Sequence, residues 1–231
     1  GESDDLEDLV AIPAERFREE RDIDLRTGHE ATAIDRETAD VTVETDDGET
    51  YTVGYDELLI ATGAGALEPP IDGLDVPDVF TLQEMNAGRK LKEAVETAEY
   101  DRIGIIGGGY IGIEMAEAFR GRDIDVTLFE MREQVLPPFG ASTAETVEGE
   151  LEDNGVDVRT GTRVEAIEGE GSVEAVRTDD GSVAVDAVLV AAGVDPNVEL
   201  AERAGIDLGP TGAIATDADG LTNDESVYAA G

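Results

Sequence analysis

Residues 103–114 read IGIIGGGYIGIE, and this stretch decides the fold. Its first four residues are three isoleucines and a glycine, a composition typical of a parallel strand that is buried on both faces. Gly107, Gly109 and Gly112 follow in G-x-G-x-x-G register. In such a turn the first glycine permits a tight bend, the second lets the backbone approach a pyrophosphate, and the third lets helix and strand pack closely. We therefore predict a strand, a phosphate-binding turn and a helix whose N-terminal N–H groups face the phosphates.

A second apolar strand follows this helix and ends in an acid. Residues 124–129 read IDVTLF, and Glu130 comes next, about 20 residues beyond the glycines, where a ribose-binding carboxylate belongs. A G-x-G-x-x-G turn alone is a weak signal, because glycine-rich turns are common. Strand, glycines, helix, strand and acid occur here in the required order, so the sequence predicts a dinucleotide site.

The charge of the chain is strongly negative. Its 231 residues include 16 Lys and Arg against 56 Asp and Glu, which gives a formal net charge of −40. A polyanion is repelled by nucleic acid and by anionic membranes, so we expect neither as a partner. The acids are spread along the whole chain, and the only lysines are Lys90 and Lys92. This pattern resembles the cytoplasmic proteins of extreme halophiles, and we expect a cytoplasmic protein adapted to molar salt.

Several kinds of site are excluded or unsupported by the composition. The chain has no cysteine, so it holds no disulfide, zinc-thiolate site or cysteine nucleophile of its own. We expect no metal site, because no ligand cluster stands out. His29 is the only histidine, and we expect it to be a surface or packing residue. The chain shows no apolar run of membrane-spanning length and no signal peptide at its start.

The order of predicted elements divides the chain. Pro69, Pro70 and Pro77 mark a linker. Before it we predict a helix at 13–20 and strands at 23–26, 29–35, 40–45, 49–53 and 58–61, with a hairpin turn at 45–48 (TDDG). After it we predict a helix at 82–98, the glycine turn, and a helix at 142–154 with Ser142 as its N-cap.

An internal repeat connects the two parts. DLRTG at 24–28 returns as DVRTG at 157–161, and TDDG at 45–48 returns as TDDG at 178–181, both at an offset of 133 residues. Ile34 and Ile167 are separated by the same 133 residues. A shared offset indicates two copies of one nucleotide-binding unit. Carried back from Gly107, it places the first copy's own glycine turn upstream of residue 1, so we expect this chain to be a fragment of a longer enzyme.

At this point the residues resemble the flavoprotein pyridine nucleotide-disulfide oxidoreductases, in the branch of NADH oxidase, NADH peroxidase and coenzyme A-disulfide reductase. The segments that carry the resemblance are YDELLIATGA (55–64), GGGYIGIEMAEAF (107–119), AAGVDPN (191–197) and VYAAG (227–231). The resemblance implies an α/β fold: a Rossmann-like NAD-binding domain with a parallel sheet and an antiparallel β-meander, inserted in parts of a homologous FAD-binding domain. We expect a partial FAD-binding domain at 1–79, the NAD-binding domain at 80–196, and a return segment of the first at 197–231.

The resemblance assigns residues to the nicotinamide dinucleotide. The glycine turn and the start of its helix would contact NADH, with Glu130 on the adenosine ribose and Gly193 near the nicotinamide. Tyr110 resembles the family's gate residue over the flavin, and Glu114 its carboxylate near the nicotinamide. Phe139 lies where relatives have a cofactor-contacting aromatic, although it could equally be a core residue. The residues implied to bind NADH are Gly107, Gly108, Gly109, Tyr110, Ile111, Gly112, Glu130, Phe139 and Gly193. We expect Arg132 to pair with local acids.

The resemblance also implies contacts with FAD and a missing set of catalytic residues. Ala31 would contact FAD by its backbone, and Thr62 and Gly63 would lie near its adenine side. The family's redox cysteine and FAD glycine loop would lie upstream of residue 1, and its ribityl aspartate just after Gly231. The resemblance implies no catalytic residue within the chain beyond the possible roles of Tyr110 and Glu114. It implies a homodimer formed through a further C-terminal domain.

The sequence leaves the function of the parent protein open among three readings. The first is an FAD-dependent NADH oxidoreductase that passes electrons to a small-molecule acceptor, which the sequence does not identify. The second is a flavoprotein reductase without a redox cysteine, which feeds a ferredoxin-like partner. The third is a non-catalytic dinucleotide-binding module. In the first two readings the hydride chemistry belongs to the cofactors, and the protein supplies alignment.

Overall fold

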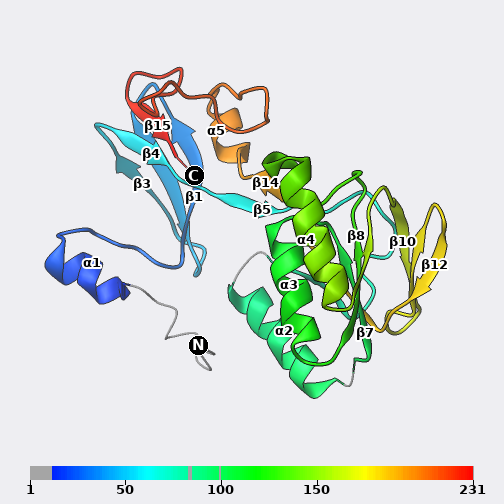
Figure 1. The fold of residues 1–231 in the computed structure, drawn as a ribbon. Helices are drawn as coiled ribbons and strands as arrows, with labels where there is room; N and C mark the ends of the chain where they lie inside the picture. Colours follow the sequence, from blue (N-terminus) through cyan, green and yellow to red (C-terminus); the bar gives the residue numbers. More distant parts are fainter. Residues whose placement is uncertain (1–11, 83–84, 99, 231) are drawn as a thin grey trace. The chain divides into compact units, whose positions relative to one another are not determined.

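The computed structural model describes residues 12–82, 85–98 and 100–230 (Figure 1). The chain forms two compact units. One runs to Ala64 and resumes at Pro196, and the other comprises Gly65–Asp195. The chain therefore passes from the first unit to the second after Ala64, earlier than the expected boundary after residue 79. The reason is that side chains of the proline-rich stretch, including Ile71, Leu74 and Val76, pack against the core of the second unit.

The second unit is built on a five-stranded parallel sheet. Its strand order is β6-β13-β7-β8-β9, and each neighbouring pair is parallel. The strands are β6 (Val79–Thr81), β7 (Arg102–Ile106), β8 (Asp125–Phe129), β9 (Val156–Arg159) and β13 (Ala187–Val190). The two predicted strands, β7 before the glycine turn and β8 after the helix that follows it, are thus confirmed, and they pair with each other. Because the strands are parallel, all their carboxyl ends meet at one edge, where ligands bind in open α/β sheets.

Both faces of this sheet are covered. Helices lie on one face, and a three-stranded antiparallel meander lies on the other (Figure 1). The helices are α2 (Met85–Thr97), α3 (Tyr110–Arg120) and α4 (Ala141–Asp153), and the meander consists of β10 (Val164–Glu168), β11 (Ala175–Thr178) and β12 (Gly181–Ala184). In β13, Leu189 packs under the helices and Val188 under the meander. Burial on both faces explains why these strands read as continuous apolar runs.

The first unit has a smaller set of elements. It contains α1 (Ala14–Glu20), α5 (Glu199–Arg203), and the meander β1 (His29–Asp35), β2 (Asp40–Thr45) and β3 (Thr50–Gly54). The last strand, β15 (Val227–Ala229), pairs in parallel with β4 (Leu58–Ile60). The expected return of the C-terminal segment to the first sheet is therefore confirmed. Ile34, Ile60 and Val227 share one buried cluster.

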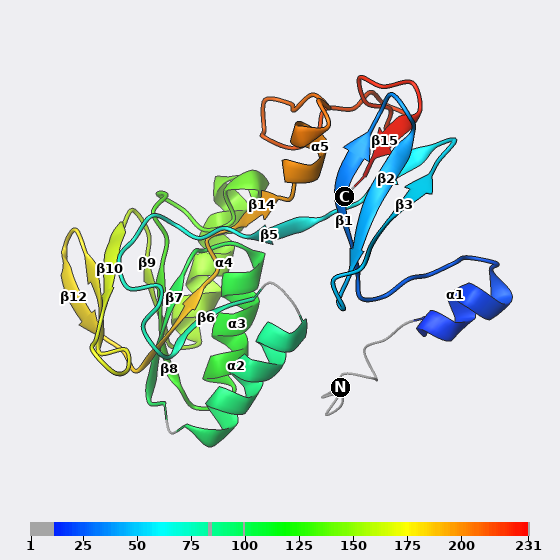
Figure 2. The ribbon, with the colours of Figure 1, turned by 180° about the vertical axis from the view of Figure 1, so that it is seen from behind.

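The internal repeat has a structural counterpart in the two meanders, which Figure 2 shows from behind (β1–β3 and β10–β12). In the first, the register shifts between Ala31 and Ala33. In the second, it shifts between Val164 and Ala166. These bulges lie at the same 133-residue offset as the sequence repeats, so even a local irregularity of pairing recurs. A conserved position for a bulge is expected of two copies of one unit.

The segments that cross between the units form a short ladder of their own. β5 (Ala64–Ala66) pairs with β14 (Val194–Pro196). One further element, the 3₁₀ helix η2 (Pro137–Phe139), follows β8 and precedes α4. Within the described part of the chain, no helix is long and apolar enough to cross a membrane.

Two sequence predictions are wrong in detail. Residues 23–26 do not form a strand. Their repeat counterpart β9 pairs with β8, and the described residues supply no equivalent neighbour here. Instead Arg18 donates two hydrogen bonds to the Leu25 carbonyl oxygen. Ser142 is not an N-cap either. Gly140 precedes α4 with no side-chain cap, while Ser142 lies inside the helix and its carbonyl oxygen accepts the Thr146 hydroxyl.

Candidate functional site

The glycine turn at the carboxyl end of β7 requires glycine at its first and last positions. Gly107 has a φ of 116°, and a Cβ there would overlap the carbonyl oxygen of Ala191, which follows β13. A Cβ on Gly112 would overlap the carbonyl oxygen of Gly107. The turn therefore brings backbone against backbone at two points, as the sequence predicts.

Gly109 is glycine for a different reason. It is the N-cap residue of α3, with φ −84° and ψ −171°, angles that other residues also adopt. A Cβ built on it meets no atom within 4 Å. No side chain caps α3, so the first N–H groups of the helix are not occupied by a capping oxygen. Open space next to uncapped amides suits an anionic group.

Glu130 follows β8 directly, and its side chain is tied to the glycine turn. One carboxylate oxygen accepts the Gly108 N–H at 2.8 Å, and the other accepts the Arg132 N–H at 2.7 Å. Each oxygen keeps a second acceptor position. The sequence predicted an acid at the end of this strand, but it did not predict that the acid would accept a hydrogen bond from the glycine turn.

Both backbone polar groups of Gly108 are hydrogen-bonded. Its N–H donates to Glu130, and its carbonyl oxygen accepts the Leu136 N–H at 2.9 Å. A Cβ on Gly108 would lie 3.0 Å from Val135 Cγ1 and 3.1 Å from Glu130. The loop after β8 is thus fitted closely against the glycine turn.

That loop is anchored in turn by α4. Val135 is fully buried, and its N–H donates to the Glu148 carboxylate at 2.9 Å. Leu136 has a φ of 46°, a left-handed conformation that is uncommon for a residue with a branched side chain. Sequence reasoning missed Glu148, because a glutamate in the middle of an acidic helix carries no local signal.

Two aromatic residues lie at the start of α3 and in η2. The rings of Tyr110 and Phe139 are 5.3 Å apart and nearly perpendicular, which is a favourable edge-to-face arrangement. Tyr110 is 60% exposed and Phe139 is 47% exposed. The core interpretation of Phe139 is therefore wrong. Ile111 and Glu114, also on α3, are exposed as well.

The remaining predicted residue of this unit is Gly193. It follows β13, has a φ of 125°, and its carbonyl oxygen accepts the Leu67 N–H at 3.0 Å. It lies at the same carboxyl edge of the sheet as the glycine turn. Arg132 differs from expectation, because within the described residues its guanidinium makes no ion pair or hydrogen bond with an acid.

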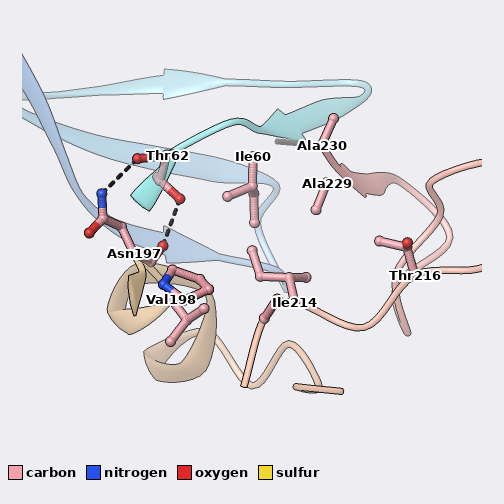
Figure 3. A pocket seen from close by; sticks show the side chains of 11 residues that line it. Ile60, Thr62, Asn197, Val198, Ile214, Thr216, Ala229 and Ala230 are labelled. Atoms are coloured by element: carbon pink, nitrogen blue, oxygen red, sulfur yellow. Dashed lines mark hydrogen bonds between the residues drawn. The ribbon is translucent and has the colours of Figure 1, made fainter. Parts of the chain in front are cut away.

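In the first unit, a cavity of about 180 Å³ lies at the ends of β4 and β15. Figure 3 shows Thr62, Ile60 and Ala230 in its lining, with Asn197 next to Thr62. The Thr62 hydroxyl donates to the Asn197 carbonyl oxygen at 2.7 Å, and the Asn197 amide donates to the Thr62 carbonyl oxygen at 2.9 Å. Gly63, with a φ of 67°, accepts the Asn197 N–H.

The other predicted residues of the first unit lie outside this cavity. Ala31 is an exposed residue of β1 at the bulge and does not line it. His29 begins β1, and its Nδ1 lies 2.7 Å from the Thr27 carbonyl oxygen, in agreement with a packing role. Gly231 lies outside the described residues. Among the described residues, no group of three or more His, Cys, Asp or Glu side chains could hold a metal ion.

Residues 2–231 match the protein family described as pyridine nucleotide-disulphide oxidoreductase. The chain belongs to this family. The predicted fold class, a parallel α/β sheet with antiparallel strands, is thereby confirmed together with the family.

Individual relatives agree with this assignment. The chain is 39% identical over 226 residues to the NAD(P)H sulfur oxidoreductase (CoA-dependent) of Pyrococcus furiosus, a match that covers 97% of this chain and 50% of the relative. It is 35% identical over 227 residues to the NADH oxidase of Methanocaldococcus jannaschii, covering 98% and 50%. The chain spans about half the length of the curated relatives it matches.

A solved structure shows the same likeness. The crystal structure of reduced Bacillus anthracis CoADR-RHD matches this chain with a TM-score of 0.92 at 32% sequence identity. The match covers 97% of this chain and 41% of that one.

Proposed function

We propose that the unit of residues 65–195 binds NADH and that the parent protein is an FAD-dependent NADH oxidoreductase. When bound, the two cofactors supply hydride transfer from nicotinamide to flavin, and the protein binds and aligns them. The observation that carries the proposal is the hydrogen bond between the glycine turn and Glu130. The glycine turn leads into an uncapped helix, and the Glu130 carboxylate is bonded to that turn.

The pyrophosphate would lie against Gly107–Gly112. Gly109 leaves open space where any other residue would place a Cβ, so the backbone can approach an anion closely. The free N–H groups and the positive dipole end of α3 would stabilise the phosphate charge. On a chain of net charge −40, this fixed positive end is important, because the surrounding field repels a dinucleotide.

Glu130 would bind the adenosine ribose. Its two oxygens already hold backbone N–H groups, which fixes their direction and leaves acceptor positions for the two ribose hydroxyls. The same carboxylate would repel the additional phosphate of NADPH, so we propose a preference for NADH. The guanidinium of Arg132, which has no acidic partner among the residues that the structure describes, works against that preference, since arginine binds phosphate bidentately.

The nicotinamide end would lie at the exposed start of α3 and near Gly193. We propose that Tyr110 covers the flavin until NADH enters and that Phe139 supports the tyrosine ring by its edge-to-face contact. Glu114, exposed one turn into α3, would lie near the nicotinamide.

The first unit would contribute part of an FAD site through Ala31, Thr62 and Gly63. The cavity of this unit supports the roles of Thr62 and Gly63, because they line it at the carboxyl ends of two parallel strands, where nucleotides bind. At about 180 Å³ it is smaller than the roughly 300–1,000 Å³ of typical small-molecule sites. We therefore propose that this chain alone binds FAD weakly. Stoichiometric FAD that survives gel filtration of the chain would contradict this.

The cellular setting completes the proposal. The acidic, lysine-poor surface supports a cytoplasmic protein of a high-salt organism. The acceptor would be a small molecule, and the parent would be a homodimer through a region outside these residues. We propose that the unit of residues 65–195 is the NAD-binding domain and that the other compact unit is part of the FAD-binding domain.

The test is a titration of the chain with NADH in molar KCl. Glu130→Ala should weaken NADH binding roughly ten- to hundredfold, as expected for loss of hydrogen bonds to a charged group. Glu133→Ala removes the same charge from an exposed neighbour in the same loop and should bind NADH like the wild type. Equal affinities of the wild type and Glu130→Ala would remove Glu130 from the ribose site.

A further inference from the structure

Glu148 lies on α4, far from the glycine turn in sequence, yet its carboxylate binds the loop after β8 that packs against this turn. It accepts the N–H of Val135, a residue with no exposed surface. This hydrogen bond satisfies a buried backbone donor, and a buried donor left without an acceptor is costly. This hydrogen bond joins the two ends of the segment of residues 135–148.

The residue after Val135 shows why such an anchor is needed. Leu136 has a φ of 46° and lies in the left-handed region. Backbone in that region persists in non-glycine residues only where its surroundings impose it. Its N–H donates to the Gly108 carbonyl oxygen at 2.9 Å, and its carbonyl oxygen accepts the Phe139 N–H at 2.9 Å. The strained residue is therefore the junction between the glycine turn and the aromatic ring.

We propose that Glu148 is a positioning residue of the dinucleotide site. Through the Val135 N–H it holds Leu136 in its left-handed conformation. Leu136 then orients Gly108 from the carbonyl side, while Glu130 orients it from the N–H side. The same turn sets Phe139 against Tyr110. Glu148 thus pre-orders the phosphate and nicotinamide regions without contacting the ligand, which lowers the ordering cost of binding. This inference rests on the proposed NADH site.

The experiment compares three single variants of the full chain in molar KCl. Glu148→Ala removes the acceptor, whereas Glu148→Gln keeps an acceptor oxygen at the same place. Glu145→Ala removes one charge from an exposed position of the same helix. NADH dissociation constants are measured by titration, and amide hydrogen exchange is measured for the peptide that covers residues 130–140.

Glu148→Ala should bind NADH roughly five- to tenfold more weakly, as expected for one charge-assisted hydrogen bond, and Glu148→Gln should recover most of the loss. Exchange at Val135 and Leu136 should rise in Glu148→Ala and stay low in the other two variants. A purely structural role would lower the unfolding midpoint without changing NADH affinity at temperatures where the variant remains folded.

The outcomes separate the two proposals. If the wild type does not bind NADH, the proposed function fails. If the wild type binds NADH and Glu148→Ala binds it equally well despite faster exchange at 130–140, the positioning role of Glu148 is overturned. Equal loss of affinity in Glu145→Ala would likewise overturn it, because the effect would then be one of charge alone.

Discussion

The Glu130 carboxylate accepts the Gly108 N–H at 2.8 Å, so the acid at the end of β8 is bonded to the glycine turn at the end of β7. The two strands are neighbours in the parallel sheet, and this hydrogen bond joins their carboxyl ends. In a dinucleotide site the turn serves the pyrophosphate and the acid serves the ribose. Their direct contact would order the two proposed subsites together.

Gly109 and Gly112 should separate binding from stability. Gly112→Ala places a Cβ on the Gly107 carbonyl oxygen, so it should lower the unfolding midpoint markedly. Gly109→Ala places a Cβ in open space at ordinary backbone angles, so the midpoint should hardly change while NADH binding weakens at least tenfold. Thermal unfolding and NADH titration of both variants check this. Normal NADH binding by Gly109→Ala would show that no phosphate lies close to the Cα of residue 109.

Arg132 should reduce the preference for NADH over NADPH by binding the additional phosphate of NADPH. Its guanidinium has no acidic partner within the described residues, so it is available to a phosphate. Arg132→Ala should leave the affinity for NADH nearly unchanged and lower the affinity for NADPH roughly tenfold, which corresponds to about 1.4 kcal/mol of binding free energy. Arg163→Ala, which removes a charge from an exposed arginine elsewhere in the unit, is the matched control. An unchanged NADPH affinity in Arg132→Ala would exclude it from contact with the phosphate.

Stability should rise steeply with salt concentration. The Debye length falls from about 10 Å at 0.1 M salt to about 3 Å at 1 M, which removes most of the repulsion among surface carboxylates. With a net charge of −40, the unfolding midpoint should therefore climb between dilute buffer and molar KCl. Thermal unfolding by circular dichroism at several KCl concentrations measures it. A midpoint that stays flat over this range is the contrary result.

Asp224 should stabilise the first unit in a pH-dependent way. Its hydrogen bonds from Arg36 and from Ser226 lower its pKa from 3.8 to about 2. Because the pKa is lower in the folded state, this stabilisation is fully present above pH 3.8 and is lost as the pH falls towards about 2. Asp224→Asn should thus lower the unfolding midpoint at pH 7, and the difference from the wild type should shrink below pH 4.

The control for that prediction is Asp219→Asn, which removes the same charge at an exposed site. It should leave the midpoint unchanged at pH 7 or raise it slightly, since it reduces the net negative charge. Equal midpoints for Asp224→Asn and Asp219→Asn would show that the Arg36–Asp224 pair contributes no net stability.

The positions of the strands and of the glycine turn could be predicted because local composition determines them. Ile103, Ile105 and Ile106 are apolar since both faces of β7 are buried, and this leaves a continuous apolar run in the sequence. The repeat at 133 residues predicted two copies of one unit, and two meanders with bulges at that offset agree with it. The prediction of a strand at residues 23–26 was wrong because a strand also needs a neighbouring strand, and residue propensity does not reveal whether one is present.

The sequence by itself determined the fold class and the family. Its local pattern also identified Gly107, Gly109, Gly112 and Glu130 as the candidate site, since the glycines and the acid at the strand end stand at a set spacing. Only the tertiary structure decided how these residues are held. Glu148 reaches the loop after β8 from α4, the ring of Tyr110 on α3 contacts that of Phe139 in η2, and within the described residues the Arg132 guanidinium has no acidic partner. Such contacts join residues far apart in the chain, and they depend on packing and side-chain direction, which no local pattern encodes.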